Sequence, residues 1–367
     1  MSSAEQVPQL VPHDIVVIGA SAGGVEALRR LIAALPQAFA ASVFVVLHVP
    51  SNSHSALPQI LQRAGKLPVR HASDGEIFRP GVVYVAPPDA HLLVKPGHLS
   101  LLHGPTENGH RPAIDPLFRS AAAAYGPRVI GVILSGVLDD GTSGLLTVSQ
   151  AGGITVVQSP DDALYPSMPS SAMHSVPVDV VASCDEIGAA LQRLSMHPSP
   201  DPVEVAVPAP ERDYTERALR GGGELEMRGR PSRFTCPDCG GALWESTEEG
   251  TSKFRCRVGH SWTSMALLEE QSSALEQALW TALRTLAERA DLARRMRDQA
   301  EGRNHPHAQR LFDQQLEELE RKATVIRDVL GRPEPLIVPL EHELALAPAD
   351  VADIDDRDLP SSESAAS

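Results

Sequence analysis

The chain has 367 residues, of which 47 are acidic and 32 are basic, and its formal net charge is -15. This length allows one domain of about 200 residues with a second, smaller unit. The negative charge disfavours binding to nucleic acid or anionic lipid, because both would be repelled. We therefore expect a protein of more than one domain that binds no nucleic acid.

Residues 1–13 contain no basic segment followed by a long apolar core, so neither a secretory signal nor a transit peptide is predicted. No apolar run approaches the roughly 18 residues that a membrane span requires. We expect residues 1–13 to be disordered, and we expect a cytoplasmic protein without direct insertion into a membrane.

Residues 14–195 alternate between apolar runs rich in Val and Ile and segments with helical periodicity. This pattern indicates an α/β domain with a doubly wound, mostly parallel sheet. Residues 68–102 differ, because Gly, Pro and short alternating pieces there indicate a β-hairpin insertion. The predicted strands are 14–18, 43–48, 82–86, 128–134, 154–157 and 179–181, and the predicted helices are 24–35, 55–64, 115–125, 141–151, 169–174 and 185–194.

The first predicted strand leads into Gly19-Ala20-Ser21-Ala22-Gly23, a G-x-S-x-G sequence that stands before a predicted helix. In this context the small neighbours allow a tight turn that exposes a nucleophilic serine. A phosphate-binding turn of a dinucleotide domain is the alternative. It is disfavoured, because Ser21 replaces the second glycine of that fingerprint and the second strand ends in His48 instead of an acid.

His48 follows a second apolar strand, so a parallel sheet would bring it to the same edge as Ser21. A third strand ends in a segment that contains Asp139 and Asp140. A carboxylate at that position could orient His48 and stabilise its protonated form. Spacing alone does not choose between the two aspartates, and the other one is expected to serve only a helix cap or turn.

Seven separate segments in residues 14–194 together resemble the catalytic domain of the CheB-type protein-glutamate methylesterases. The segments are VIGASAGG, VVLHVP, YVAPPDAHLL, RPAIDPLF, GVILSGVLDDGTSG, AGGITVVQSP and YPSMPSSA, in this order. The resemblance implies a serine hydrolase that removes γ-methyl esters from glutamates of methyl-accepting chemotaxis receptors. It also implies deamidation of receptor glutamines as a related activity, and the methylated cytoplasmic helices of receptors as the partner.

By the same resemblance, Ser21 is the nucleophile, His48 the general base and Asp140 the orienting acid. Backbone N–H groups at Ala22 and Val137 would form the oxyanion hole. His110 and Arg111, with Asp115, are further candidates to line the substrate groove, although a capped helix start with a solvated loop explains them equally well. Catalysis of this kind requires no cofactor.

Two substitutions depart from the usual family pattern: Ala22 stands where Thr or Ser is common, and Leu138 replaces a glycine. They keep an alternative open, in which the domain is a catalytically weak receptor-binding or signalling scaffold whose C-terminal region recruits a partner. Well-known members also begin with a receiver domain. Since only 13 residues precede the first strand, we expect no receiver domain and no control by phosphorylation within this chain.

Residues 196–233 are rich in proline and are predicted to form an extended linker. Residues 234–263 follow with a C-x2-C pair and a C-x3-H pair. A Cys3His set satisfies tetrahedral zinc and leaves no open position, so we expect a zinc-ribbon-like module with a structural zinc. Its predicted ligands are Cys236, Cys239, Cys256 and His260. Buried or redox-active cysteines are the less favoured alternative.

Residues 264–331 are predicted to form an antiparallel helical hairpin. One apolar stripe consists of Phe312, Leu316, Leu319, Ala323, Ile326 and Leu330, and the other of Leu268, Leu275, Leu279, Leu283 and Leu286. The stripes are expected to pack together, or to serve a protein partner or self-association. Residues 332–367 are acidic and rich in proline, and we expect a disordered tail.

Overall fold

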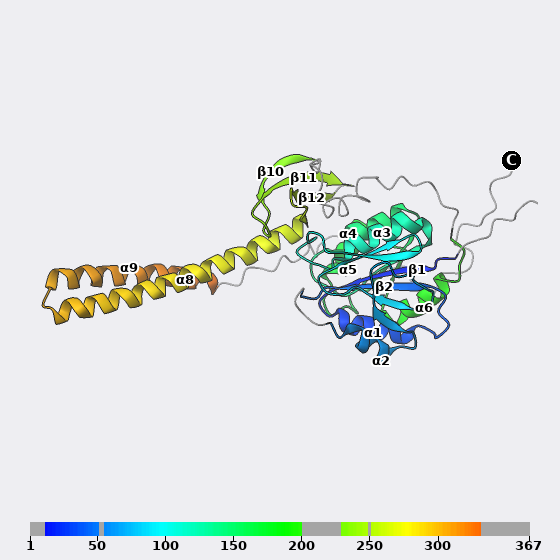
Figure 1. The fold of residues 1–367 in the computed structure, drawn as a ribbon, viewed down its shortest axis with the longest axis horizontal. Helices are drawn as coiled ribbons and strands as arrows, with labels where there is room; N and C mark the ends of the chain where they lie inside the picture. Colours follow the sequence, from blue (N-terminus) through cyan, green and yellow to red (C-terminus); the bar gives the residue numbers. More distant parts are fainter. Residues whose placement is uncertain (1–11, 51–54, 200–228, 249–250, 332–367) are drawn as a thin grey trace, which may run out of the picture. The chain divides into compact units, whose positions relative to one another are not determined.

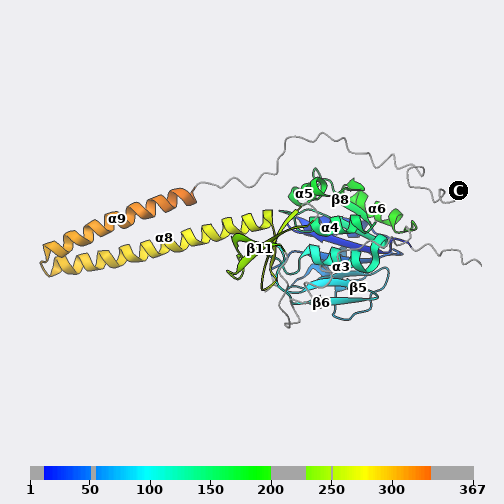
Figure 2. The ribbon, with the colours of Figure 1, turned by 90° about the horizontal axis from the view of Figure 1, so that it is seen from above.

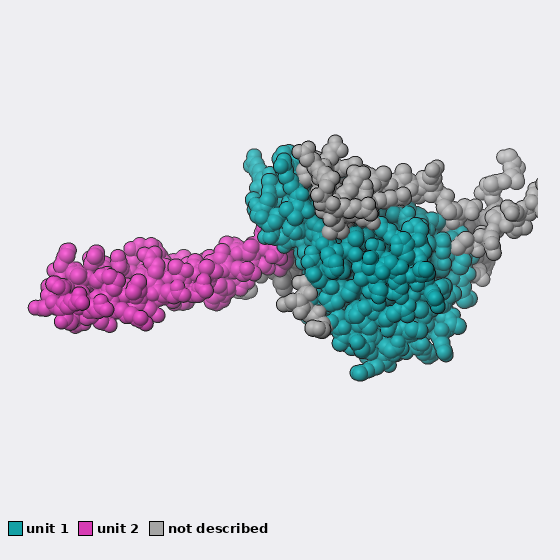
Figure 3. All heavy atoms as spheres, in the orientation of Figure 1, with its two compact units in different colours: residues 1–266, 343–367 teal, residues 267–342 magenta. Residues whose placement is uncertain are grey.

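The computed structural model describes residues 12–50, 55–199, 229–248 and 251–331. The predicted disordered N-terminus except Pro12 and His13, most of the predicted linker and the predicted acidic tail therefore lie outside the described residues. His13 is buried, and its N–H donates to the His197 carbonyl over 3.3 Å, so the prediction of disorder does not hold for this residue. The chain divides into two compact units, and the boundary lies between Ala266 and Leu267 (Figure 3). None of the described helices is both long enough and apolar enough to cross a membrane.

Seven strands of the first unit form a wholly parallel sheet in the order β3-β4-β2-β1-β7-β8-β9 (Figure 1). This confirms the predicted α/β fold. The chain moves to one side of β1 to form β2, β4 and β3, and to the other side to form β7, β8 and β9. The strands are β1 (Ile15–Ala20), β2 (Ser42–Leu47), β3 (Val69–His71), β4 (Val83–Val85), β7 (Val129–Ile133), β8 (Ile154–Gln158) and β9 (Val180–Ala182).

Helices cover both faces of this sheet, so the central strands β1, β2 and β7 are apolar on both sides (Figure 1). In β1, Val16 and Ile18 face the core below α1, α2 and α6, whereas Ile15 and Val17 face the core below α3, α4 and α5. The helices are α1 (Gly24–Ala34), α2 (Leu57–Ala64), α3 (Ile114–Tyr125), α4 (Thr142–Gln150), α5 (Ser167–Ser175) and α6 (Cys184–Leu194), with the short 3-10 helix η1 (Gly126–Arg128).

The segment predicted as a hairpin insertion has two parts. The strands β5 (His91–Lys95) and β6 (His98–Leu102) form the expected antiparallel hairpin, seen beside α3 in Figure 2. The beginning of the segment instead forms β3, which pairs in parallel with β4 at the edge of the main sheet. This strand has only three residues, none of them fully buried, so the sequence carried no strand pattern for it.

A second sheet, which we call the ribbon, also belongs to the first unit. Its four antiparallel strands are β10 (Arg230–Thr235), β11 (Ala242–Glu248), β12 (Thr251–Cys256) and β13 (Ser261–Thr263). The predicted division of this unit into domains 14–195 and 234–263 stays a prediction.

The second unit consists of the helix α8 (Ser264–Gly302) from Leu267 onward and the helix α9 (Pro306–Leu330). Both views show α9 running back along α8 (Figures 1 and 2). Leu316 and Leu319 of α9 pack against Ala290 and Ala293 of α8, with Leu286 beside them. Leu268 and Leu275, at the start of the predicted α8 stripe, are about half exposed, so the expected packing of the two stripes does not include them. The helix α8 is 39 residues long and α9 only 25, so the first turns of α8 extend past the end of α9.

Candidate active site

Three loops at the carboxyl edge of the parallel sheet hold the predicted catalytic residues. Ser21 follows β1, His48 follows β2, and Asp140 lies in the loop between β7 and α4. The chain reverses its winding direction between β1 and β7, and open α/β sheets bind their ligands at such a point. The topology therefore explains why residues so distant in sequence share one edge.

The turn at Ser21 depends on the two glycines that follow it. Gly23 adopts a left-handed conformation with φ of 72°. A Cβ atom at Gly24 would lie only 2.7 Å from Cβ of Ala20 and 2.8 Å from Cδ1 of Leu47, so α1 begins where only glycine fits. The Ser21 N–H donates to the Ser135 carbonyl over 3.0 Å, which joins the turn to the loop after β7.

The imidazole of His48 lies between the hydroxyl of Ser21 and the carboxylate of Asp140. Its Nδ1 is 3.1 Å from Ser21 Oγ, and its Nε2 is 2.7 Å from Asp140 Oδ2. The ionised carboxylate accepts a hydrogen bond from the Nε2–H, so the proton of the neutral ring stays on Nε2 and Nδ1 is free to accept the hydroxyl proton. The structure thus brings these three predicted residues together in a chain along which a proton can move.

Asp140 is held as an anion in the protein interior. Burial raises the pKa of Asp140, but the hydrogen bond and charge of His48 and the Ile114 N–H outweigh it, so that the pKa is well below its usual value. The Ile114 N–H donates to Oδ2 over 2.7 Å, and Asn108 Nδ2 donates to Oδ1 over 3.0 Å. Both carboxylate oxygens therefore have fixed partners.

Asp139, the alternative acid, faces a different partner. Its Oδ1 accepts a hydrogen bond from Thr263 Oγ1 over 2.8 Å, and α4 begins after Gly141 without a side-chain cap. Burial raises the pKa of Asp139 to about 6, with a further contribution from the Asp140 carboxylate. Of the two aspartates, Asp140 is the one that contacts His48.

The predicted oxyanion donors, Ala22 and Val137, lie on the two loops that flank Ser21. Their N–H groups donate to no other residue in the described part of the chain. Leu138, which stands where the family pattern has glycine, retains the glycine-like left-handed backbone with φ of 63°. Its carbonyl accepts bonds from Ser167 and Ser171 of α5, each over 3.3 Å, so the loop is held in this shape.

The residues predicted to line a groove have distinct surroundings. The His110 ring stacks on the His48 ring with 3.7 Å between their centroids. Burial and, to a lesser extent, the charge of His48 lower the pKa of His110 to about 4. Arg111 is engaged in an ion pair with Asp89, with 2.9 Å between Nε and Oδ1. Asp115 is buried and accepts the Gly144 N–H over 2.7 Å, so it holds α3 against α4 instead of lining a groove.

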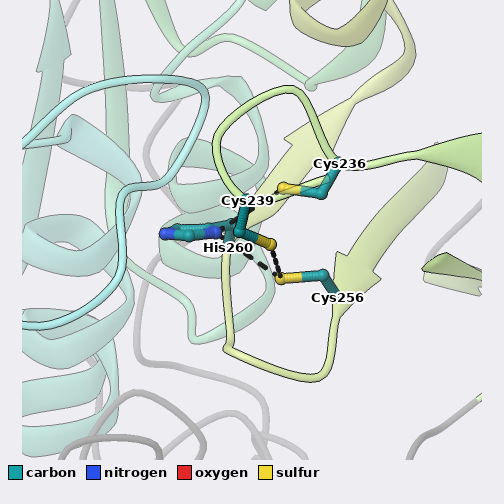
Figure 4. Close-up of side chains that lie close together, drawn as sticks. All are labelled: Cys236, Cys239, Cys256 and His260. Carbon is teal, nitrogen blue, oxygen red and sulfur yellow. Dashed lines mark hydrogen bonds between the residues drawn. The ribbon is translucent and has the colours of Figure 1, made fainter. Parts of the chain in front are cut away.

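The four predicted metal ligands of the ribbon converge (Figure 4). His260 Nδ1 is 3.5 Å from Sγ of both Cys236 and Cys256, and Cys239 Sγ is 3.6 Å from Cys256 Sγ. Zinc–ligand bonds of about 2.0–2.3 Å in a tetrahedron separate ligand atoms by roughly 3.5–3.8 Å. This ligand set therefore fits a metal ion, and the Asp238 carboxylate lies 3.9 Å from Nε2 of His260.

Two residues near the site were not predicted from the sequence. Asn108 donates to Asp140, and Thr263 of the ribbon donates to Asp139. The Asn108-Gly109 pair indicates only a turn, and Asn108 indeed has φ of 51°. Nothing in the sequence indicates that its side chain forms a hydrogen bond with Asp140 in a distant loop.

Comparison with known proteins gives one consistent result. A family profile described as CheB methylesterase matches residues 16–191. A Leptospira interrogans relative is 37% identical over 186 residues, which are 50% of this chain and 96% of that protein; its curated name gives protein-glutamate methylesterase and protein-glutamine glutaminase activity provisionally. An Anaeromyxobacter dehalogenans protein named protein-glutamate methylesterase/protein-glutamine glutaminase 3 is 40% identical over 187 residues.

The match covers 49% of this chain and 55% of the Anaeromyxobacter protein, so the chain spans about half the length of that relative. Among solved structures, the catalytic domain of the CheB methylesterase from Thermotoga maritima is 35% identical. The match covers 49% of this chain and 98% of that one, with a TM-score of 0.48.

Proposed function

This chain belongs to the CheB methylesterase family, and on that premise we propose that it is a serine hydrolase acting on methyl-accepting chemotaxis receptors. It removes γ-methyl esters from glutamates of the receptors' cytoplasmic helices, and accordingly acts in the cytoplasm. The observation that carries this proposal is the placement of His48, whose two ring nitrogens contact Ser21 Oγ and Asp140 Oδ2 over 3.1 Å and 2.7 Å.

In this reaction, His48 Nδ1 takes the proton of Ser21 while Oγ attacks the ester carbonyl carbon. Asp140 stabilises the imidazolium that forms. The N–H groups of Ala22 and Val137 stabilise the oxyanion, and such donors typically contribute about 3 kcal/mol each. Methanol leaves with the proton from His48, and an acyl-enzyme remains on Ser21. A water molecule, deprotonated by His48, then releases the glutamate carboxylate.

The same steps deamidate a receptor glutamine, with ammonia as the leaving group in place of methanol. Both curated relatives carry this second activity in their names. No cofactor enters either reaction, because the three side chains and the backbone donors supply the nucleophile, the base and the charge stabilisation.

The scaffold alternative loses one of its two supports. It rested partly on Leu138, yet this residue keeps the left-handed backbone that the loop requires. Ala22 removes a side-chain hydroxyl but leaves the backbone N–H in place. We therefore keep hydrolysis as the proposed function.

A fluorophosphonate probe, which phosphonylates activated serines, tests the proposal directly. The wild-type chain is expected to be labelled at Ser21, because His48 can accept the hydroxyl proton. His48→Ala is expected to slow labelling by at least a hundredfold. Ser55→Ala, at a serine before α2, is the matched control and should label like the wild type. An unlabelled wild-type chain that is folded by circular dichroism favours the scaffold.

We further propose that Cys236, Cys239, Cys256 and His260 hold a structural zinc ion. The spacing of their ligand atoms supports this, and the four ligands complete a tetrahedron without an open position. Elemental analysis is expected to find about one zinc per chain, and Cys236→Ser should lose it. Cys184→Ser is the control, since Cys184 is buried in the α/β core. A well-folded wild-type ribbon free of metal contradicts the assignment.

A further inference from the structure

The ribbon forms hydrogen bonds with the loop that precedes α3. The Asn108 N–H donates to the Ser261 carbonyl over 2.8 Å, and the Ser261 N–H donates to the Thr106 carbonyl over 3.2 Å. Glu107 and Ser261 thereby form a parallel bridge. The buried Trp262 ring lies against Gly109, where an added Cβ atom would be 3.5 Å away. Strand β13 is thus paired with a loop of the α/β fold.

One side chain connects this contact to the catalytic acid. The Oδ1 atom of Asn108 accepts the Thr263 N–H over 2.8 Å, while its Nδ2 donates to Asp140 Oδ1 over 3.0 Å. Asn108 is 7% exposed, so water cannot readily replace either partner. Because the amide oxygen can only accept and the amide nitrogen can only donate, these two bonds fix the orientation of the amide. The ribbon therefore determines where Asn108 presents its N–H to Asp140.

Charges of the ribbon support the same contact. Burial raises the pKa of Glu107, but the cations of Arg119 and of Arg255 in β12 outweigh it and hold the pKa below its usual value. Lys253, also in β12 and 2% exposed, lowers the pKa of Asp139 against the effect of burial. The ribbon thus brings basic side chains toward buried carboxylates that flank the site.

The contact lies at the acid end of the triad and leaves the nucleophile accessible. Asp140 is 3% exposed, whereas Ser21 is half-buried and Val137 is 43% exposed. Residues 261–263 form β13, the strand that pairs with the loop before α3 and that we call the docking strand. They directly follow His260, one of the four proposed zinc ligands. A change at the metal site therefore reaches the docking strand without an intervening segment.

We propose that Asn108 is a positioning residue through which the metal-bearing ribbon orients Asp140, and with it His48. The ribbon is then an activating part of the esterase, and loss of its metal lowers turnover without covering Ser21. This inference rests on the proposed function and on the proposed zinc site. It goes beyond both, since it assigns the ribbon a role in the reaction.

The test is Asn108→Asp in the full chain. Aspartate has the same size and tolerates the left-handed backbone, and it can still accept the Thr263 N–H, but it cannot donate to Asp140. Asn304→Asp is the matched control, because Asn304 has a similar φ of 56° and lies in the turn between α8 and α9. Hydrolysis of p-nitrophenyl acetate reports the triad, and methanol release from methylated receptors reports the proposed substrate.

Asn108→Asp is expected to lower kcat for p-nitrophenyl acetate on the order of tenfold to a hundredfold, with KM changed less than about twofold. In the plot of kcat/KM against pH, the fall in activity on the acidic side should move to higher pH, because the added negative charge favours the protonated imidazole of His48. A merely structural role would not cause this shift. Asn304→Asp should match the wild type in both respects.

Chelation of the full chain provides the second arm. In the wild type, removal of zinc should lower kcat on the order of tenfold, and added Zn²⁺ should restore it. In Asn108→Asp, the same treatment should change kcat less than about twofold, because the substitution and the loss of zinc interrupt the same connection between the ribbon and Asp140. Hydrogen exchange at the amides of Asn108 and Thr263 should accelerate in the metal-free wild type.

The inference is overturned if Asn108→Asp has the kcat and the pH profile of the wild type. It is also overturned if the metal-free wild type keeps its kcat and its protection from hydrogen exchange. Either result leaves the proposed function standing. A chain that hydrolyses p-nitrophenyl acetate but releases no methanol from methylated receptors overturns the proposed substrate, and the inference is still decided by the variants. A wild-type chain that hydrolyses neither substrate overturns both.

Discussion

At the scale of single residues, two neighbouring aspartates in the loop between β7 and α4 direct their side chains to different partners. Asp140 faces His48, Ile114 and Asn108, while Asp139 faces Thr263 of the ribbon. Three donors keep Asp140 ionised in the interior. Asp139 has the single hydroxyl of Thr263 as its side-chain donor in the described part of the chain, and burial therefore dominates its pKa.

This difference predicts a pH-dependent stability. The pKa of Asp139 is raised from 3.8 to about 6 in the folded chain, so between pH 4 and 6 the folded state keeps a proton that the unfolded chain has lost. The free energy of unfolding must then fall as pH rises through this window. Asp139→Asn, which still accepts the Thr263 hydroxyl, should be more stable than the wild type by about 1–2 kcal/mol at pH 8 and equal to it at pH 3.5.

Urea unfolding of the first unit, followed at both pH values, checks this prediction. Asp161→Asn, a change of the same kind at an exposed position, should show no such difference between the two pH values. A stability gain that is the same at pH 3.5 and pH 8 contradicts the titration argument.

The sequence indicated much of the site at this scale, and the reason is topological. Ser21 and His48 each follow an apolar strand, so their placement at one edge follows from parallel pairing alone. The choice between Asp139 and Asp140 could not be made from spacing, because both lie in one irregular loop. Asn108 was missed, since its function comes from two hydrogen bonds to residues 32 and 155 positions away.

At the scale of elements, long periodic segments were predictable and short or unpaired ones were not. The strands β1 and β7 are apolar throughout because helices cover both faces. By contrast, β3 has only three residues, and its position is determined by its parallel pairing with β4 at the edge of the sheet. In α8, the leucine spacing predicted a continuous stripe, but the length of α9 determines how much of it is covered.

The helical hairpin allows a prediction on one helix. Leu319 is 8% exposed and packs against Ala290 and Ala293, whereas Leu311 is 51% exposed. Leu319→Ala should destabilise the hairpin by about 2 kcal/mol, which corresponds to roughly thirtyfold faster hydrogen exchange in α9. Leu311→Ala should change it by less than about 0.5 kcal/mol. Equal effects of the two substitutions would show that this seam does not hold the helices together.

At the scale of the whole molecule, the ribbon and the α/β fold belong to one compact unit, and the second unit begins after the docking strand. Composition and motifs predicted the two modules separately. Their connection through β13 could not be predicted, because it depends on hydrogen bonds between a loop and a strand that are each irregular in sequence. The proposed catalytic acid, Asp140, is thereby linked to the proposed metal ligands, which begin at Cys236.

The central claim is that Ser21, His48 and Asp140 hydrolyse a methyl ester on a receptor glutamate. Its most direct test is methanol release from methylated chemoreceptors, measured with the full-length wild type and with Ser21→Ala. The account predicts continuous release by the wild type and none above background by Ser21→Ala, although both chains are folded. Equal release by the two chains, or no release by a wild type that reacts with a fluorophosphonate at Ser21, would contradict it.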